Sequence, residues 1–321
     1  MHDVTNIGVW IGFSLFLIIA LSLDTFVLHR SSRTDAPSMR TALCWTLIWI
    51  GTALIFNVLI WFFNPQKALE FFAGYLIEKS LSIDNLFAFY MIFHQFRIPA
   101  AYQQRIFSIG IWSAIILRLL LILGGTWLVT HFHWMLYLMG AFLVLTGLKM
   151  GLMHEKEKDL TETSLIHFMK RFMRITHEIH GNHFFIRKDA KLYATGLFLA
   201  LVFIEISDIV FAFDSIPAIF AVTMDPFIVW SSNIFAILGL RALYFLLAGM
   251  VTRFHLLKYG IALILIFVGS KMLIEPWVHV SVLVSLSVII GILLLFTYLS
   301  MRELACSPSK PPSTKPNKSA N

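Results

Sequence analysis

The sequence is poor in charged residues and in cysteine. Only 13% of its 321 residues are charged, whereas 58% are hydrophobic, and the mean hydropathy is +0.80. An ordinary soluble domain has about 25% charged residues, so this composition excludes a water-soluble globular protein. The two cysteines, Cys44 and Cys306, have no metal-type spacing and do not suggest a disulfide framework. No nucleophile–base pair or cofactor motif is present, so we do not expect an enzyme.

Apolar runs long enough to cross a bilayer, about 20 residues each, recur along the chain. They predict an all-α fold, a polytopic bundle of about nine transmembrane helices, with no cleaved signal peptide because no basic residue precedes the first run. The predicted spans are 7–28, 43–63, 70–94, 106–129, 133–153, 192–222, 227–250, 258–274 and 279–300.

Lysine and arginine concentrate in alternate connections between these spans. Segment 29–42 carries three, 95–105 two and 154–191 eight, whereas the intervening connections carry at most one, Lys67. The positive-inside rule then places the N-terminus in the periplasm and the C-terminus in the cytoplasm of a bacterial inner membrane. The net charge of +7 therefore indicates topology, and no nucleic-acid partner is expected.

The two halves of the sequence resemble each other. FHWMLYLMGAFLVLTGLKM (132–150) aligns without gaps on FHLLKYGIALILIFVGSKM (254–272), and DNLFAF (84–89) matches DIVFAF (208–213). Each predicted repeat holds three helices, an odd number, so the second copy must be inverted in the membrane. Transporters built from inverted repeats bind their substrate between the repeats near the membrane midplane.

This repeat divides the chain into six predicted parts. They are two peripheral helices (1–69), repeat 1 (70–153), a cytoplasmic loop with an amphipathic helix (154–191), repeat 2 (192–275), a last transmembrane helix (276–302) and a disordered cytoplasmic tail (303–321).

Six acidic residues lie inside the apolar runs. Each ionised carboxylate at the bilayer centre costs about 2.5–3.5 kcal/mol or more, so the group needs a counter-charge. Asp24 is alone in the first span and is a possible functional residue. The other five fall in the third and sixth spans: Glu78, Asp84, Glu205, Asp208 and Asp214.

Buried ion pairs are one source of that counter-charge. Arg118 and Arg241 occupy nearly equivalent repeat positions and are the predicted structural partners. Lys79 and Lys271 could also support the acids as ion-pair partners. Lys149 and Lys271 lie near span ends, however, and could extend toward the interface instead. Intramembrane Asn57 and Asn233 are expected to bond helix to helix.

A bound cation is the other source, and the one we favour. Glu205 and Asp208 share one helix face, whereas Asp214 lies about 120° away on a straight helix. Pro217 is expected to break the helix and let the three acids converge. Further oxygen ligands are available from Ser82, Asn85, Ser207 and Ser215.

Carboxylate, amide and hydroxyl oxygens suit Mn²⁺, Mg²⁺ or Ca²⁺, whereas Zn²⁺ and Cu⁺ usually recruit imidazole or thiolate. Neither histidine nor cysteine accompanies the five acids. Protons could use the same carboxylates. The histidines of HEIHGNH (177–183) are read as ordinary residues of a basic loop.

The segments GYLIEKSLSIDNLFAF (74–89), EISDIVFAFDSIPAIFAVTMDPFIVWSSNIFAILGLRALYFLL (205–247) and NHFFIRK (182–188) resemble the TerC family of membrane proteins, most closely its Alx branch. The resemblance implies a divalent-metal exporter, chiefly for Mn²⁺, related to LysE-type transporters with 3+3 repeats. The family's acidic positions carry over to Glu78, Asp84, Glu205, Asp208 and Asp214. Tellurite resistance does not follow, because carboxylates suit a cation rather than an oxyanion.

The sequence thus predicts a Mn²⁺ efflux transporter that works by alternating access, with protons as the counter-ion. Transport of Ca²⁺ or Mg²⁺ through the same site remains open. So does a non-transporting membrane scaffold that supplies metal to exported enzymes. The residues do not indicate an oligomeric state.

Overall fold

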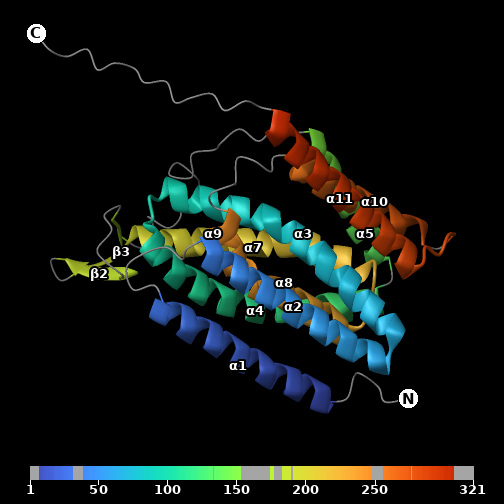
Figure 1. The fold of residues 1–321 in the computed structure, drawn as a ribbon, viewed down its shortest axis with the longest axis horizontal. Coiled ribbons are helices and arrows are strands. Elements are labelled where there is room, and N and C mark those ends of the chain that lie inside the picture. Colours follow the sequence, from blue (N-terminus) through green and yellow to red (C-terminus); the bar gives the residue numbers. More distant parts are fainter. Residues whose placement is uncertain are drawn as a thin grey trace, which may run out of the picture.

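The computed structural model describes residues 7–31, 39–132, 134–152, 174–176, 183–188, 191–247, 256–275 and 277–306. These residues are mostly helical (Figure 1). The helices are α1 (Ile7–Ser31), α2 (Met39–Phe63), α3 (Pro65–Gln95), α4 (Ala100–His131), α5 (Met135–Leu152), α7 (Gly196–Phe220), α8 (Pro226–Leu238), α9 (Leu240–Leu247), α10 (Leu257–Ile274) and α11 (Val282–Cys306).

The predicted all-α membrane fold is confirmed. Among the described residues, six helical segments are long and apolar enough to span a bilayer: Met39–Phe63, Ala100–His131, Met135–Leu152, Gly196–Phe220, Pro226–Leu246 and Val282–Ser300. Large apolar side chains such as Phe62, Leu120 and Leu294 point outward, as expected of a protein whose solvent is lipid. The count of nine spans stays a prediction. Helix α3, which covers the predicted third span, is not among these six segments, and it carries the charged residues Glu78 and Lys79.

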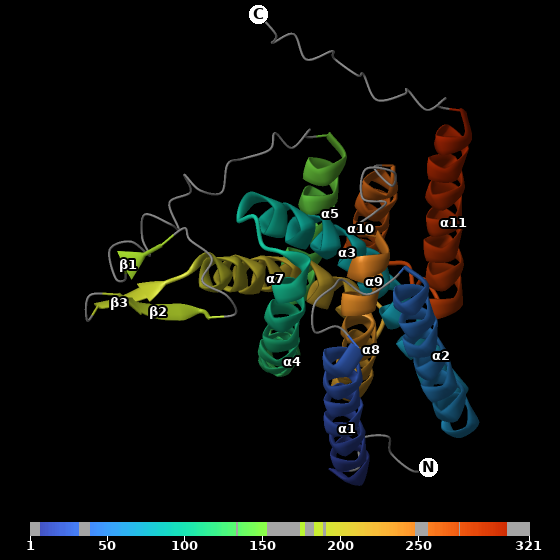
Figure 2. The ribbon, with the colours of Figure 1, turned by 60° about the vertical axis from the view of Figure 1, so that its left-hand side comes forward.

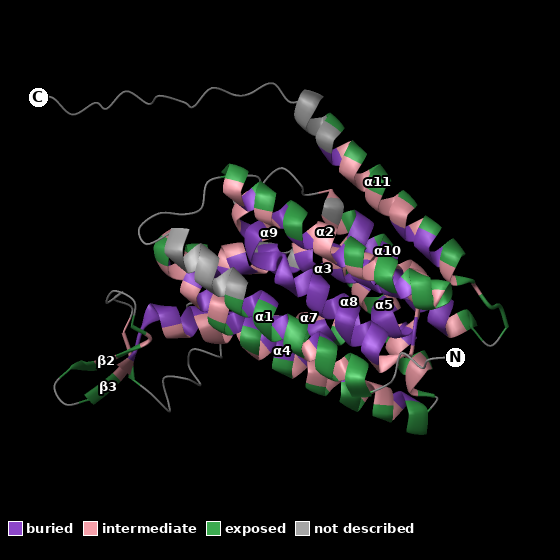
Figure 3. Ribbon diagram, turned by 60° about the horizontal axis from the view of Figure 1, so that its bottom comes forward, coloured by how far each residue is buried: buried purple, intermediate pink, exposed green. Residues whose placement is uncertain are grey.

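The most buried helix is α8, which packs against α3 and α4 (Figure 3). Helix α7 packs against both α3 and α4. Helices α5, α10 and α11 lie on one side of this centre and α1 and α2 on the other (Figures 1 and 2). The centre therefore combines helices from both predicted repeats.

Helix α7 corrects one expectation. It runs without interruption from Gly196 to Phe220 and contains Pro217, so the unwound turn predicted at Asp214 does not occur in this helix. Pro217 lies in the last turn, where its missing N–H removes only one helical hydrogen bond before the helix ends. The interruption is instead in the next span, where a turn at Gly239 separates α8 from α9.

A small sheet lies between α5 and α7 in the sequence, where we predicted a loop (154–191) and the start of the sixth span (192–222), whose helix begins only at Gly196. Strands β1 (Arg174–Ile175) and β2 (Phe185–Lys188) flank β3 (Lys191–Ala194), parallel and antiparallel to it respectively. Strand β1 covers the last two residues of the segment that we predicted as an amphipathic helix (164–175). The rest of that segment lies outside the described residues, as does most of the predicted tail. At the other end, α11 continues to Cys306, past its predicted end at residue 302.

Helices α5 and α10 pack closely through glycines. A Cβ atom added to Gly269 would lie 2.6 Å from the carbonyl oxygen of Gly140, and one added to Gly147 would lie 2.7 Å from that of Ala262. Small residues allow two membrane helices to approach in this way. The backbones of α5 and α10 are therefore in near contact at two levels.

This packing predicts opposite effects for two glycine-to-alanine substitutions. We expect Gly269→Ala to destabilise the protein by about 1–3 kcal/mol, because overpacking pushes the two backbones apart. Gly124→Ala is the control, since a Cβ atom there meets nothing within 4 Å, and alanine favours a helix by up to about 1 kcal/mol. Thermal unfolding of the detergent-purified variants measures both, and a Gly269→Ala protein as stable as Gly124→Ala would contradict the close approach.

Candidate functional site

A buried arginine lies at the centre of the candidate site. Arg118 of α4 is 1% exposed and pairs with two of the predicted ligands, Glu78 of α3 and Asp208 of α7. Its Nη2 donates to Asp208 Oδ1 (2.9 Å), and its Nε donates to Asp208 Oδ2 (3.3 Å). Its Nη1 donates to Glu78 Oε1 and to Asn233 Oδ1 of α8 (2.9 Å). We call Glu78, Arg118, Asp208 and Asn233 the arginine cluster.

The cluster joins four helices that are far apart in the sequence. All three guanidinium nitrogens donate to acceptors, which a rigid planar fork permits and a lysine would not. Burial of a charge is tolerable when it is paired and hydrogen-bonded in this way. The predicted roles of Arg118 as an ion-pair partner and of Asn233 as a bond between helices are both confirmed.

The predicted convergence of the acids is wrong for the described side chains. No group of three or more Asp, Glu, His or Cys among them lies close enough to hold a metal ion. The reason is the straight α7, which turns Asp214 away from Glu205 and Asp208. The side chains of Asp84 and Asp24 lie outside the described residues.

Glu205 lies one helical turn before Asp208 and faces α4. Its Oε1 accepts a hydrogen bond of 2.5 Å from Ser113 Oγ. The same oxygen would be only 3.4 Å from a Cβ atom at Gly110, so the glycine leaves room for the carboxylate. Ser113 was not among the predicted site residues, because a lone serine in an apolar span gives no distinctive signal.

Asp214 faces a different set of residues. A cavity of about 30 Å³ lies between α3, α5, α7 and α10, and its lining includes Asn85, Asp214 and Ser215. Thr146 and Lys149 of α5 also interact with the Asp214 carboxylate, Thr146 as a hydrogen-bond partner and Lys149 through its charge. The cavity is large enough for a single water or ion, since about 10–15 Å³ suffices.

Several buried oxygen atoms of the predicted ligands have no hydrogen-bond partner among the described residues. Nearly all buried polar atoms in native proteins are satisfied, so this group requires an explanation. Three are on α3 at positions i, i+4 and i+7, which share one helix face, and two are on α7. The atoms are Glu78 Oε2, Ser82 Oγ, Asn85 Oδ1, Asp214 Oδ1 and Ser215 Oγ.

The other predicted site residues have ordinary partners. Ser207 donates to the Phe203 carbonyl of its own helix (2.8 Å), so it is satisfied without a ligand. Lys271 donates to the Ala221 carbonyl (2.9 Å), and Arg241 donates to Ser108 Oγ (3.3 Å). An acidic partner for Arg241 stays a prediction.

Lys79 is partly buried beside the interruption between α8 and α9. Its amine donates to the Ala236 carbonyl (3.3 Å) near the end of α8, and a Cβ atom at Gly239 would lie 2.9 Å from the Lys79 nitrogen. A cation at the C-terminal end of a helix is favourably placed. Among the described residues, Lys79 therefore binds the end of α8.

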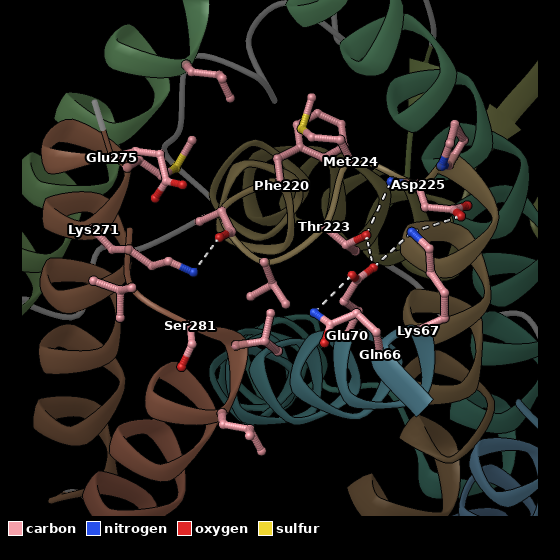
Figure 4. A pocket seen from close by; sticks show the side chains of 18 residues that line it. Gln66, Lys67, Glu70, Phe220, Thr223, Met224, Asp225, Lys271, Glu275 and Ser281 are labelled. Atoms are coloured by element: carbon pink, nitrogen blue, oxygen red, sulfur yellow. Dashed lines mark hydrogen bonds and ion pairs between the residues drawn. The ribbon is translucent and has the colours of Figure 1, made fainter. Parts of the chain in front are cut away.

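A larger cavity of about 760 Å³ opens at one end of the bundle (Figure 4). It brings together the connections before α3, between α7 and α8, and between α10 and α11, all of which the charge pattern assigns to the periplasmic side. Lys67 lies between Glu70 Oε2 (3.1 Å) and Asp225 Oδ2 (3.2 Å), and Thr223 donates to Glu70 (2.6 Å). Burial lowers the pKa of Lys67, but Glu70 and Asp225 outweigh it and raise that pKa above 10.5.

This outer network was not predicted. Its residues lie at span ends, where charged side chains are ordinary and carry no signal by themselves. The network ties the start of α3 to the turn before α8 and so closes one side of the cavity.

Comparison with known proteins gives one consistent result. The model of the integral membrane protein TerC family matches residues 63–305. "Putative membrane-bound redox modulator Alx" of Escherichia coli K12 is 47% identical over 304 residues, covering 92% of this chain and 94% of that protein. An uncharacterised membrane protein of Myxococcus xanthus is 47% identical (91% of each chain), and one of Rickettsia bellii is 39% identical (91% of this chain, 96% of the other). No solved structure matches the chain.

Proposed function

The chain belongs to the TerC family of integral membrane proteins, and on this premise we propose that it exports a divalent cation, Mn²⁺, across the bacterial inner membrane. The transported ion is the substrate rather than a resident cofactor. Glu78 and Asp214, with the neutral oxygens of Ser82, Asn85 and Ser215, supply its path between α3 and α7.

The observation that carries this proposal is the set of buried oxygen atoms on α3 and α7 that have no hydrogen-bond partner among the residues that the structure describes. Asn85, Asp214 and Ser215 line one cavity, and a protein interior that serves only packing has little reason to bury such atoms, since each costs about 1–3 kcal/mol. A hard dication is bound by this kind of donor, a mixture of carboxylate, amide and hydroxyl oxygens. Water could satisfy some of the same atoms between transport cycles.

The two glycine contacts between α5 and α10 support the inverted repeat. At the repeat offset of 122, Gly140 corresponds to Ala262 and Gly147 to Gly269. The contact of Gly140 with Gly269 is therefore the counterpart of the contact of Ala262 with Gly147. Reciprocal contacts of this kind are those of a two-fold axis. Rocking of one repeat against the other about that axis would expose the site alternately to each side.

Protons are the proposed counter-ion. Glu205 and Asp214 are not part of the arginine cluster, and their carboxylates can be protonated without breaking its ion pairs. The departure of a dication leaves negative charges close together, which favours protonation.

Purified protein in liposomes tests this function. We expect Mn²⁺ to enter liposomes that contain the protein and a trapped Mn²⁺-sensitive dye, at a rate well above that of empty liposomes. An imposed pH gradient should change this rate, and an unchanged rate would contradict proton coupling. Competition by Ca²⁺ and Mg²⁺ ranks the alternative substrates. Absence of flux from a folded protein would instead favour the metal-supplying scaffold.

A further inference from the structure

The arginine cluster contains one more negative charge than positive charge. Glu78 and Asp208 contribute two carboxylates, and Arg118 contributes the one positive charge that pairs with them. Its hydrogen bonding is also incomplete, because Glu78 Oε2 and Asn233 Nδ2 have no partner among the described residues. A purely structural ion pair gives no reason to leave a charge and two polar atoms unmatched.

We propose that Arg118 is a resident counter-cation, which competes with the transported dication for Glu78 and Asp208 and keeps the affinity of the site low enough for release. This inference rests on the proposed transport function and concerns its regulation. Arg118 acts here as a positioning residue, because it works through the two carboxylates and does not itself bind the cation.

The geometry makes the competition direct. Both oxygens of Asp208 accept from Arg118, so a cation bound there would share each oxygen with the guanidinium unless the guanidinium moves. One oxygen of Glu78 also accepts from Arg118, and only Oε2 remains. A dication bound at Oε2 would share a carboxylate with the guanidinium and be repelled by it across a short distance. In a buried site this repulsion is only weakly screened.

Competition of this kind serves a transporter. Two unopposed carboxylates in a buried site would bind a dication tightly and release it slowly. A tethered positive charge replaces the departing ion at once and leaves the empty site with no more than one uncompensated negative charge. Transport requires binding that is strong enough to capture the ion and weak enough to let it leave.

Arg118→Gln provides the test, because glutamine retains hydrogen-bonding capacity but removes the charge. We expect this variant to bind Mn²⁺ about tenfold more tightly or better (~1.4 kcal/mol per tenfold), measured by isothermal titration of detergent-purified protein. Transport in liposomes should show a lower KM together with a lower maximal rate. Thermal unfolding should become more dependent on Mn²⁺ than in the wild type, because the metal replaces the missing counter-charge.

The matched control is Lys271→Gln, which removes a positive charge whose amine donates to the carbonyl of Ala221 rather than to a carboxylate of the cluster. Its Kd for Mn²⁺ should equal that of the wild type. If Arg118→Gln does not fold, Arg118→Lys replaces it. Lysine keeps the charge but cannot make the two-pronged bond to Asp208, so we expect Arg118→Lys to bind Mn²⁺ more tightly than the wild type.

These measurements distinguish a failure of the proposed transport function from a failure of the inference about Arg118. Wild-type protein that neither binds nor transports Mn²⁺ overturns the proposed function and this inference with it. Wild-type protein that does both, accompanied by a folded Arg118 variant whose Mn²⁺ affinity is unchanged or weaker, overturns only the inference and leaves Arg118 as a structural ion-pair partner.

Discussion

Cells that carry Asp214→Asn in place of the wild-type protein should lose Mn²⁺ export, by on the order of 100-fold in rate (~2.7 kcal/mol). Asp214 shares a cavity with Asn85 and Ser215, and one of its buried carboxylate oxygens has no hydrogen-bond partner among the described residues. Asparagine has nearly the same shape but lacks the negative charge that compensates a dication. Intracellular Mn content after a Mn²⁺ load, compared with wild type, measures the effect.

Ser207→Ala is the control on the same helix, because the Ser207 hydroxyl is already satisfied by the carbonyl of Phe203. Export by that variant should be normal. Normal export by Asp214→Asn, at an equal amount of protein in the membrane, would refute the proposed ion path.

Removal of the buried arginine should have the largest effect on stability. We expect Arg118→Ala to lower the free energy of unfolding by about 3–5 kcal/mol in the absence of metal, because it leaves Glu78 and Asp208 buried and without a counter-charge. Asp208→Ala should cost less, since Arg118 then keeps Glu78 as a neutralising partner. Unfolding of the purified variants in detergent, followed by heat or denaturant, gives these values.

The double variant Arg118→Ala with Asp208→Ala shows whether the two side chains act as a unit. Residues in one ion-pair network are coupled, so the double variant should cost less than the sum of the single ones. Additive losses would mean that the bonds of the arginine cluster do not stabilise the protein as a pair. Thr46→Ala is a suitable reference, since its hydroxyl bonds only the Ala42 carbonyl within α2 and its loss should have little effect.

The local pattern of apolar and polar residues was enough to predict the class of protein and most of its helices. Apolar runs require helices in a bilayer, where every backbone polar group must be satisfied internally, and the described parts of the predicted spans are mostly helical, although the seventh span is divided between α8 and α9. Arg118 and Asn233 were also correctly predicted as partners between helices, because a polar residue in an apolar span has few other uses. The sheet of β1, β2 and β3 was missed because its strands are short and exposed and lie in a charged loop.

The partners of the acidic side chains were decided by the tertiary structure. Helical periodicity predicts that Glu205 and Asp208 share a helix face and that Asp214 does not. The structure agrees, because Pro217 lies too near the end of α7 to break the helix at Asp214. Which acid receives a partner depends on α4, whose Arg118 is 90 residues from Asp208 in the chain. Only packing of α3, α4, α7 and α8 places one guanidinium between two carboxylates and leaves other oxygens without a partner in the described part of the chain. The sequence by itself determined that these acids are buried in a membrane, and the packing determined which of them are neutralised by the protein.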